Sequence, residues 1–255
     1  MAKKILIKQE RKTTVDGRSI RLSKFEKHYV DDDKDFSTQY GMIKEKDLKK
    51  IAGSTIKSGK EEFIILNPVF IDHYKQIKRL AQIITLKDIG AIITYTGLTK
   101  DSFVLDAGAG SGAVSSFLGM LVKKVVSYDV NDAHLEVAKK NIETLNLKNV
   151  EVKKGDVYKG VDEKNIDVFV LDVPEPWRAL KTAEQILKVG GFVVSYSPNI
   201  TQTQKFVAGL NDKFLHEKTV EIMERVWDVR GEILKPKMKD IGHTAFLTFI
   251  RKIKK

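Results

Sequence analysis

A glycine-rich turn follows an apolar run in the stretch Val104-Leu-Asp-Ala-Gly-Ala-Gly-Ser-Gly-Ala113, and a helical pattern follows the turn. This order predicts a strand, a loop and a helix that together cradle a nucleotide. Gly108, Gly110 and Gly112 carry no Cβ, so the backbone can turn sharply there and approach a ligand closely. Alone the loop is a weak signal, because dinucleotide-binding enzymes share it and a tight turn without a ligand has the same pattern.

Strand and helix patterns alternate around this loop from Lys87 onward. Predicted strands cover residues 103–106, 125–129, 150–153, 168–171 and 192–196, and predicted helices cover residues 88–96, 112–122, 133–145, 177–187 and 201–210. This alternation predicts an α/β fold with a parallel, doubly wound, Rossmann-like sheet. Residues 220–229 and 244–251 alternate without a helix between them, which predicts an antiparallel hairpin at the sheet edge. Class I methyltransferases that use S-adenosylmethionine (SAM) end in this way.

The composition is that of a folded, basic chain. Of the 255 residues 42% are hydrophobic, none is cysteine, and the formal net charge is +11. The lack of cysteine excludes disulfides and thiolate metal sites, and the five histidines are too scattered for a structural zinc site, so no metal is expected. Charges interrupt every apolar run and the N-terminus lacks a secretory signal, which predicts a cytoplasmic protein without membrane contact.

The positive charge is concentrated in two flanking segments. Lys and Arg outnumber Asp and Glu by five in residues 1–75, by two in residues 76–210 and by four in residues 211–255. A lysine-rich, well-solvated surface is one explanation. The other is a polyanionic partner, most simply RNA, which the flanking segments would bind through its phosphates.

The first 70 residues have a pattern of their own. Short alternating runs at residues 4–8, 19–22 and 63–66 are separated by turn signals at Asp16-Gly17 and Ser58-Gly59, and residues 44–52 have the pattern of a short helix. We therefore expect a small β-rich domain in residues 1–70, with a role in RNA binding or oligomerisation. Residues 71–255 would form the catalytic domain.

Three acidic residues lie near the ends of successive predicted strands. Asp129 ends the second strand, where a carboxylate can accept both hydroxyls of a ribose. Asp106 is expected at the mouth of the loop, where it would repel a pyrophosphate but attract the sulfonium and ammonium groups of SAM. Asp156 follows the third strand, where an adenine amine needs an acceptor. SAM is therefore the expected cofactor, although each acid alone is also typical of a helix cap or a solvated turn.

The stretch Asp172-Val-Pro-Glu-Pro-Trp177 follows the fourth strand, at the edge where strand ends line the ligand crevice of such sheets. Its two prolines stiffen the loop and remove amide donors, which fixes the directions of Asp172 and Trp177. The Asp172 carboxylate could accept a hydrogen bond from a nucleobase amine and stabilise the cation that methylation of a ring nitrogen creates. Trp177 and Tyr196 are candidates for the walls of the base pocket; the alternatives are core packing for the rings and a helix cap for Asp172.

At these residues the chain resembles the tRNA (adenine-58-N1)-methyltransferase family, often called TrmI, and in particular its archaeal members. The resemblance rests on Phe36-Ser-Thr-Gln-Tyr-Gly-Met42, Lys78-Arg-Leu-Ala-Gln-Ile-Ile-Thr-Leu-Lys-Asp88, Asp172-Val-Pro-Glu-Pro-Trp177, Tyr196-Ser-Pro-Asn-Ile-Thr-Gln202 and Gly242-His-Thr-Ala-Phe-Leu247. It implies a small N-terminal β-domain, a class I methyltransferase domain and a homotetramer. The implied target is a T-loop adenine of tRNA at position 58, with the neighbouring position 57 as a further candidate.

Carried over to matching positions, the resemblance also implies the site. SAM would be surrounded by Gln82, Asp106, Gly108, Gly110, Ser111, Gly112, Asp129, Asp156, Val157 and Asp172. Asp172 would be the catalytic carboxylate, and Tyr196 would help to shape the adenine pocket. The chain departs from the family where Thr85-Leu86 replaces a Tyr-Pro pair and Asp129 replaces a frequent Glu, which changes a contact to the target base and the reach to the ribose.

Three other functions share parts of this pattern. A non-catalytic RNA-binding subunit of such an enzyme would show decay of the glycine loop or of the Asp172 position, and both are intact. A methyltransferase for proteins or small molecules would not need the basic flanks. A nicotinamide-dependent oxidoreductase is disfavoured by Asp106, whose charge would repel the pyrophosphate.

Overall fold

The computed structural model describes residues 2–15, 18–80, 82–231, 233–238 and 242–255. Contacts divide the chain into two units, Met1–Lys75 and Gln76–Lys255, and each unit has buried apolar clusters of its own. None of the helices within the described ranges has the length and apolar character that spanning a membrane requires.

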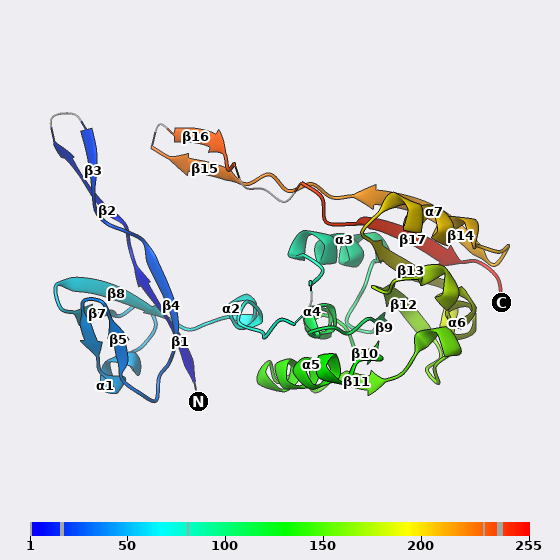
Figure 1. Cartoon of the computed structure of the whole chain (residues 1–255). Helices are drawn as coiled ribbons and strands as arrows, with labels where there is room; N and C mark the ends of the chain where they lie inside the picture. The colour runs from blue at the N-terminus through cyan, green and yellow to red at the C-terminus, as the bar shows by residue number, and fades with distance from the viewer. Residues whose placement is uncertain (1, 16–17, 81, 232, 239–241) are drawn as a thin grey trace. The chain divides into compact units, whose positions relative to one another are not determined.

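The first unit is β-rich, as its alternating runs predict (Figure 1). Its main sheet is antiparallel and has the strand order β4-β1-β8-β7. These strands are β1 (Lys3–Lys8), β4 (Glu26–Asp31), β7 (Thr55–Ser58) and β8 (Glu61–Leu66). Two ribbons and two short helices accompany them: β2 (Arg11–Val15) with β3 (Arg18–Ser23), β5 (Phe36–Thr38) with β6 (Gly41–Ile43), α1 (Glu45–Leu48) and α2 (Phe70–Tyr74).

Most local predictions for this unit are confirmed. The runs at residues 4–8, 19–22 and 63–66 correspond to β1, β3 and β8, and the turn at Ser58-Gly59 joins β7 to β8. The helix predicted for residues 44–52 is shorter, because α1 ends at Leu48 and the chain turns back so that the Gly53 N–H donates to the Ile65 carbonyl at 2.8 Å. The predicted turn at Asp16-Gly17 lies outside the described residues.

The second unit is built on a seven-stranded sheet with the order β11-β10-β9-β12-β13-β17-β14. Its parallel part confirms the five predicted strands and the α/β class. Because β9 pairs with both β10 and β12, the strand order reverses beside it, which is where such sheets form their ligand crevice. The parallel strands are β9 (Phe103–Ala107), β10 (Lys124–Asp129), β11 (Val150–Lys154), β12 (Ile166–Leu171) and β13 (Leu187–Ser197).

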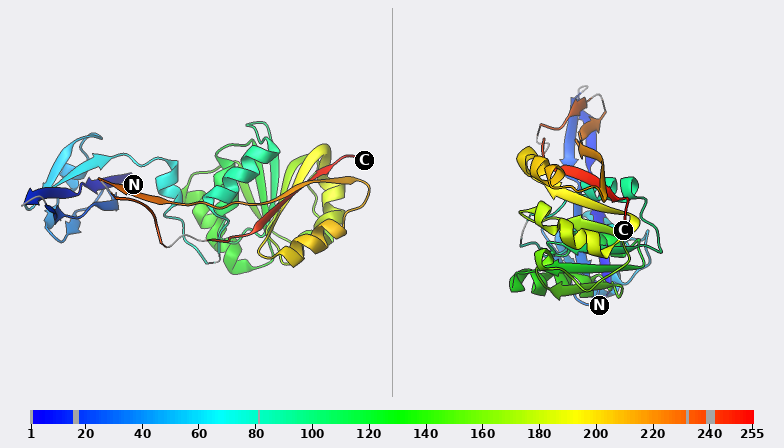
Figure 2. Two further views of the ribbon diagram at one scale, coloured as in Figure 1. Left: turned by 90° about the horizontal axis from the view of Figure 1, so that it is seen from above. Right: turned by 90° about the vertical axis from the view of Figure 1, so that its right-hand side faces the viewer.

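Helices cover both faces of this sheet (Figures 1 and 2). Side chains of successive strand residues alternate between the faces, so Val104 belongs to one apolar core and Leu105 to the other. The first core includes residues of α3 and α4, the second includes residues of α6 and α7, and α5 packs beside β10 and β11. The helices are α3 (Leu86–Thr96), α4 (Ala113–Gly119), α5 (Asp132–Thr144), α6 (Leu180–Ile186) and α7 (Ile200–Ala208).

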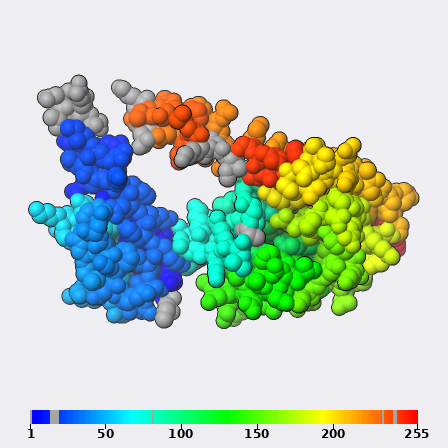
Figure 3. Space-filling model, viewed as in Figure 1, coloured from blue at the N-terminus to red at the C-terminus, as the bar shows by residue number. Residues whose placement is uncertain are grey.

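The C-terminal hairpin is antiparallel, as predicted, but its first strand is not residues 220–229. That strand is β14 (Phe214–Glu221), which pairs with β17 (Phe246–Lys252) at the edge of the sheet. Most of β14 is exposed, so it lacks the apolar alternation that reveals a half-buried strand. The chain then leaves the sheet, and β15 (Trp227–Arg230) pairs with β16 (Ile233–Pro236) in a ribbon that we call the arm. Figure 3 shows the arm in orange, projecting from the rest of the second unit.

Candidate active site

A cavity of about 380 Å³ lies at the carboxyl ends of the parallel strands, where the strand order reverses. Its wall is mostly apolar, with Ile84, Val114 and Val173 among the side chains that form it. Among the described residues that line the cavity, three are carboxylates and none is Lys or Arg. Eight residues predicted for the cofactor site lie in this wall: Gln82, Gly108, Gly110, Ser111, Asp129, Asp156, Val157 and Asp172.

The glycine loop folds tightly over the end of β9. Gly108 has a φ of 92°, and a Cβ there would lie 2.1 Å from the Asp172 carbonyl oxygen, so a side chain at this position would displace the backbone of the catalytic candidate. Gly112 has a different role from the one expected. A Cβ on Gly112 would lie 3.1 Å from the Ala138 Cβ of α5, so this glycine permits close packing of two helices, and it does not line the cavity.

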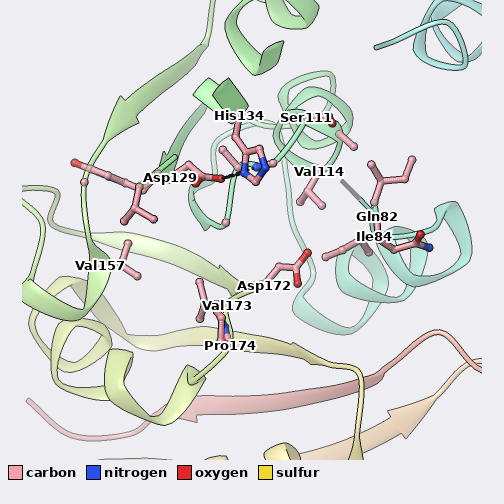
Figure 4. Close-up of a pocket in the computed structure, with 18 of the residues that line it drawn as sticks. Gln82, Ile84, Ser111, Val114, Asp129, His134, Val157, Asp172, Val173 and Pro174 are labelled. Carbon is pink, nitrogen blue, oxygen red and sulfur yellow. Dashed lines mark hydrogen bonds and ion pairs between the residues drawn. The ribbon is translucent and has the colours of Figure 1, made fainter. Parts of the chain in front are cut away.

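The segment before α3 is fastened to the glycine loop. The Ser111 hydroxyl accepts the Leu80 N–H at 3.0 Å. Asn141 of α5 accepts the Lys78 N–H at 3.0 Å and donates to the Ser111 carbonyl at 2.8 Å. These bonds bring the segment of Gln82 to the cavity wall (Figure 4).

Asp129 ends β10 and is held in a fixed orientation. Its carboxylate accepts the Gly110 N–H and the Asn131 N–H, both at 2.9 Å. His134, in the first turn of α5, lies with Nδ1 3.2 Å from Asp129 Oδ2 and also lines the cavity (Figure 4). His134 was not among the residues predicted from the sequence. The available signal was its position in the first turn of the helix that follows a strand-end acid.

A 3-10 turn, η1 (Val157–Lys159), forms another part of the wall. Asp156 precedes it, and Asp156 Oδ1 accepts the Tyr158 N–H at 3.0 Å. Val157 is buried and apolar, whereas the Tyr158 ring is half-buried and was not predicted. The Tyr128 ring, also unpredicted, lines the cavity beside Gly155, where a Cβ would come within 2.9 Å of it.

Asp172 points into the cavity from the end of β12 (Figure 4). Its N–H donates to the Ala107 carbonyl at 2.9 Å, which continues the pairing of β12 with β9 by one residue. No donor in the described part of the chain reaches its carboxylate. Burial, together with the charge of Asp129, raises the pKa of Asp172 to about 7. A half-buried carboxylate in a cavity, with a raised pKa and no hydrogen-bond donor among the described residues, is typical of a functional site.

The loop of residues 172–177, called the Asp172 loop below, leads into a 3-10 turn, η2 (Pro176–Ala179), and then α6. Of the helix predicted for residues 177–187, the part from Leu180 to Ile186 is therefore a regular α-helix. Trp177 does not line the cavity: it packs against the core on the α6 side, with the Lys205 ammonium 5.4 Å from its ring centre.

Asp106 and Tyr196 do not lie on the cavity wall, where we expected them. Asp106 is 1% exposed within β9; its Oδ2 accepts the Ser127 hydroxyl at 2.6 Å, and its Oδ1 is buried without a partner among the described residues. Burial raises the pKa of Asp106 to about 7. Tyr196 is buried in the apolar core that includes α3, because alternation along β13 turns its ring to that face, where Thr244 hydrogen-bonds to it.

The chemistry of this cavity fits SAM. Three carboxylates without a Lys or Arg would attract a sulfonium and an ammonium and would repel a pyrophosphate. The apolar wall suits a nucleobase, and the unpartnered oxygen of Asp106 leaves a buried acceptor behind the wall. Within the described ranges, no group of three or more His, Cys, Asp or Glu side chains is placed to hold a metal ion.

The strand order, the antiparallel last strand and the acid-lined cavity define a class I SAM-dependent methyltransferase fold. Two solved structures share it: a SAM-dependent O-methyltransferase of Thermotoga maritima (TM-score 0.84, 26% identity, 100% of this chain and 94% of that chain) and the tRNA (m1A58) methyltransferase TrmI of Aquifex aeolicus (TM-score 0.79, 25% identity, 99% and 97%). The chain belongs to the family described as tRNA methyltransferase complex GCD14 subunit, whose model matches residues 74–236.

Two relatives support this assignment over most of the chain. The tRNA (adenine(57)-N(1)/adenine(58)-N(1))-methyltransferase TrmI of Methanocaldococcus jannaschii is 33% identical over 248 residues, which cover 85% of this chain and 87% of that protein. The tRNA (adenine(58)-N(1))-methyltransferase TrmI of Thermus thermophilus is 34% identical over 200 residues, covering 76% and 78%. The family resemblance and the fold class predicted from the sequence are both confirmed.

Proposed function

We propose that this chain is a SAM-dependent tRNA methyltransferase that forms N1-methyladenosine at position 58 of the T-loop. Position 57 is a second proposed target, because the name of the Methanocaldococcus relative gives both positions. The observation that carries the proposal is the Asp172 carboxylate, which points into an acid-lined cavity from a loop stiffened by two prolines. Family membership and two TrmI relatives supply the substrate class.

The cofactor would occupy the cavity along the strand ends. Asp129 would accept the ribose hydroxyls, Asp156 and Val157 would hold the adenine, and Gly108, Gly110 and Ser111 would support it from the glycine loop. Gln82 and Asp172 would lie near the methionine part, with Asp106 contributing negative charge from behind the wall. SAM supplies an electrophilic methyl group on a sulfonium. The protein's own groups would orient the base and stabilise the charge that develops on it.

Asp172 would act on the target adenine in two ways. Its carboxylate would accept a hydrogen bond from the exocyclic amine, which aims the adjacent N1 lone pair at the methyl group. Methyl transfer to N1 would move positive charge from the sulfonium onto the base, and the Asp172 carboxylate would stabilise that charge as it develops. No proton has to leave N1, and no covalent nucleophile is needed. To reach the cavity, the adenine has to leave its stack in the folded RNA.

Tyr196 would contribute to the base side indirectly. Its ring is buried beside α3, and Thr244 links it to Asp88, which is fully buried and accepts the Thr244 hydroxyl at 2.8 Å. Tyr196 and this polar cluster would therefore fix the position of α3 and of the segment that carries Gln82. The role is one of support for the adenine pocket, without contact to the base.

We extend the proposal to the partners. The arm exposes Trp227, Val229 and Leu234, an apolar surface that a second copy of this chain would cover in the implied homotetramer. Arg225 and Lys235 are exposed on the same segment and have no carboxylate partner within the described residues, which suits RNA phosphates. The first unit would serve RNA binding or oligomer contacts, and a tRNA substrate would place the reaction in the cytoplasm.

One experiment tests the substrate and the product together. The protein is incubated with SAM and an unmodified tRNA transcript, and modified nucleotides are located by mass spectrometry. We expect N1-methyladenosine in the T-loop and none in the same transcript with its T-loop adenines replaced by guanine. SAM binding without methylation of the T-loop would contradict the proposal and favour a non-catalytic subunit or another methyl acceptor.

A further inference from the structure

The Asp172 loop has few polar attachments to the rest of the second unit. Pro174 and Pro176 have no N–H, so the Glu175 amide is the donor that the loop offers between them. That N–H donates to the Tyr158 hydroxyl at 3.0 Å. The bond joins the middle of the Asp172 loop to a residue of η1, which lies in another part of the sequence.

Tyr158 is at the same time part of the cofactor cavity. Tyr158 lines the cavity, and its N–H donates to Asp156 Oδ1, the carboxylate proposed to hold the adenine. Arg178 reinforces the connection from the other side, because its guanidinium lies 4.6 Å from the Tyr158 ring centre and pairs with Glu175 at 2.7 Å. One side chain therefore touches both the cofactor cavity and the loop that carries Asp172.

A second attachment of the loop comes from a residue outside the cavity wall. Gln202, in the first turn of α7, donates through Nε2 to the Pro174 carbonyl at 3.0 Å, and Gln202 does not line the cavity. The loop thus has one anchor that a bound cofactor would contact and one that it would not. Removal of the Tyr158 anchor should therefore change the effect that a bound cofactor has on the loop, and removal of the Gln202 anchor should not.

We propose that Tyr158 couples occupancy of the cofactor cavity to the placement of the Asp172 loop, and so to the binding of the target base. A cofactor that packs on the Tyr158 ring and bonds to Asp156 restricts η1, and the Tyr158 hydroxyl passes this restriction to Glu175. By linkage, cofactor and target would raise each other's affinity by the same factor. Tyr158 is a positioning residue, and the inference rests on the proposed function for its RNA part.

Hydrogen exchange tests the coupling without any RNA. In the wild-type protein, saturating S-adenosylhomocysteine should slow exchange of the Glu175 amide by about fivefold or more, because a cofactor-restricted η1 holds its acceptor in place. In Tyr158→Phe, which keeps the ring and removes the acceptor, the amide should exchange faster, and the effect of S-adenosylhomocysteine should disappear. Tyr128→Phe is the matched control: it also removes a hydroxyl from a ring of the cavity, but that hydroxyl bonds to Glu163 at 2.8 Å.

Binding measurements test the part that concerns the target. The dissociation constant of unmodified tRNA is measured with and without saturating S-adenosylhomocysteine. We expect the ligand to tighten tRNA binding to the wild type, and Tyr158→Phe to reduce this factor by about fivefold, the contribution of one neutral hydrogen bond. Gln202→Leu should weaken tRNA binding by the same factor with and without the ligand.

The outcomes separate the two hypotheses. The coupling role is overturned if S-adenosylhomocysteine does not change the exchange rate of the Glu175 amide in the wild type. It is also overturned if Tyr158→Phe keeps the wild-type response. If the exchange results hold but the protein binds and methylates no tRNA, the proposed substrate is wrong and the role of Tyr158 stands. Equal behaviour of Tyr158→Phe and Gln202→Leu would reduce Tyr158 to a structural anchor.

Discussion

A buried ion pair in the first unit and two acids at the site of the second unit differ in how their charges are met. In the first unit, Lys8 is 1% exposed, and its ammonium lies 3.1 Å from Glu26 and 4.9 Å from the Tyr40 ring centre. In the second unit, Asp106 has a buried oxygen without a partner, and Asp172 accepts no hydrogen bond from the described residues. The charge of Lys8 is neutralised within the fold and those of Asp106 and Asp172 are not, whereas the buried Asp88 of the second unit is paired with Lys87.

The pKa values follow the same division. Burial of Glu26 opposes its ionisation, but hydrogen bonds from Tyr40 and Lys8 outweigh it and lower the pKa to about 2. Burial dominates for Asp106 and Asp172 and raises both pKa values to about 7. A paired charge destabilises its unit when one partner is removed, whereas an unpaired carboxylate lowers the stability of the empty protein and gains its partner when a cationic ligand binds.

The largest effect is expected on turnover when the unpaired carboxylate of Asp172 is removed. Asp172→Ala should lower kcat for tRNA methylation by about a thousandfold, because the carboxylate acts on the base in the transition state. SAM affinity should stay within about tenfold of the wild type, since Asp129, Asp156 and the glycine loop remain. Turnover assays and calorimetric titration with SAM measure the two quantities separately. Turnover close to that of the wild type would remove Asp172 from the mechanism.

The next largest effect is expected for the buried ion pair of Lys8 and Glu26 in the first unit. Lys8→Met fills the same space but leaves Glu26 without its buried partner, so the free energy of unfolding of this unit should fall by about 2 to 3 kcal/mol. Lys34→Met is the matched control, because Lys34 pairs with Asp31 at an exposed position and should change stability by less than about 0.5 kcal/mol. Hydrogen exchange in β1 and β8 measures the loss. Similar values for both variants would mean that burial of the Lys8 pair does not matter.

Acidic pH should inactivate the site before it affects the first unit. A carboxylate with a pKa of about 7 is protonated below that pH and then neither accepts the adenine amine nor stabilises a cation. We therefore expect kcat/KM to fall about 30-fold from pH 8 to pH 5.5, with a limb near pH 7. The limb of kcat should lie at lower pH, because the cationic cofactor favours the ionised form. Asp172→Asn should have a lower rate and no such limb; persistence of the limb would assign it to Asp106.

Removing the unpaired charge of Asp106 should stabilise the protein without its cofactor. Asp106→Asn keeps an acceptor for the Ser127 hydroxyl and removes the buried charge. Because the folded-state pKa is raised, the native state binds more protons than the unfolded state between about pH 4 and 7, and wild-type stability falls as pH rises through this window. The variant should therefore gain about 1 to 2 kcal/mol at pH 8 and nothing at pH 4, as thermal unfolding measures. A smaller stabilisation by SAM should accompany the gain.

The sequence predicted the second unit well because buried parallel strands are continuous apolar runs and their carboxyl ends meet at one edge. That rule placed Asp129, Asp156 and Asp172 in one cavity. It failed for β14, whose edge position leaves His216, Glu217 and Lys218 exposed, so nothing apolar marks the strand.

The remaining errors come from side-chain direction, which spacing along the chain does not define. Asp106 and Tyr196 lie in strands of the site, but the alternation of the strands turns both side chains away from the cavity wall. His134, Tyr128 and Tyr158 reach the cavity because a helix turn, a strand end and a 3-10 turn happen to converge there. Such convergence depends on tertiary packing, which the sequence pattern does not specify.

The smallest effect should come from surface lysines of the first unit. Lys24, Lys46 and Lys60 are exposed and lack a carboxylate partner among the described residues, whereas Lys34, Lys44 and Lys49 are paired. Only a free ammonium can bind a phosphate without first leaving a carboxylate. Changing the unpaired set to Gln should therefore reduce the slope of log K for tRNA against log salt by about 1, and changing the paired set should reduce it by less. Equal changes would show that tRNA responds to the net charge of this unit. No change in either set would assign phosphate binding to the second unit, where Arg225 just before the arm and Lys235 within it have no carboxylate partner among the described residues.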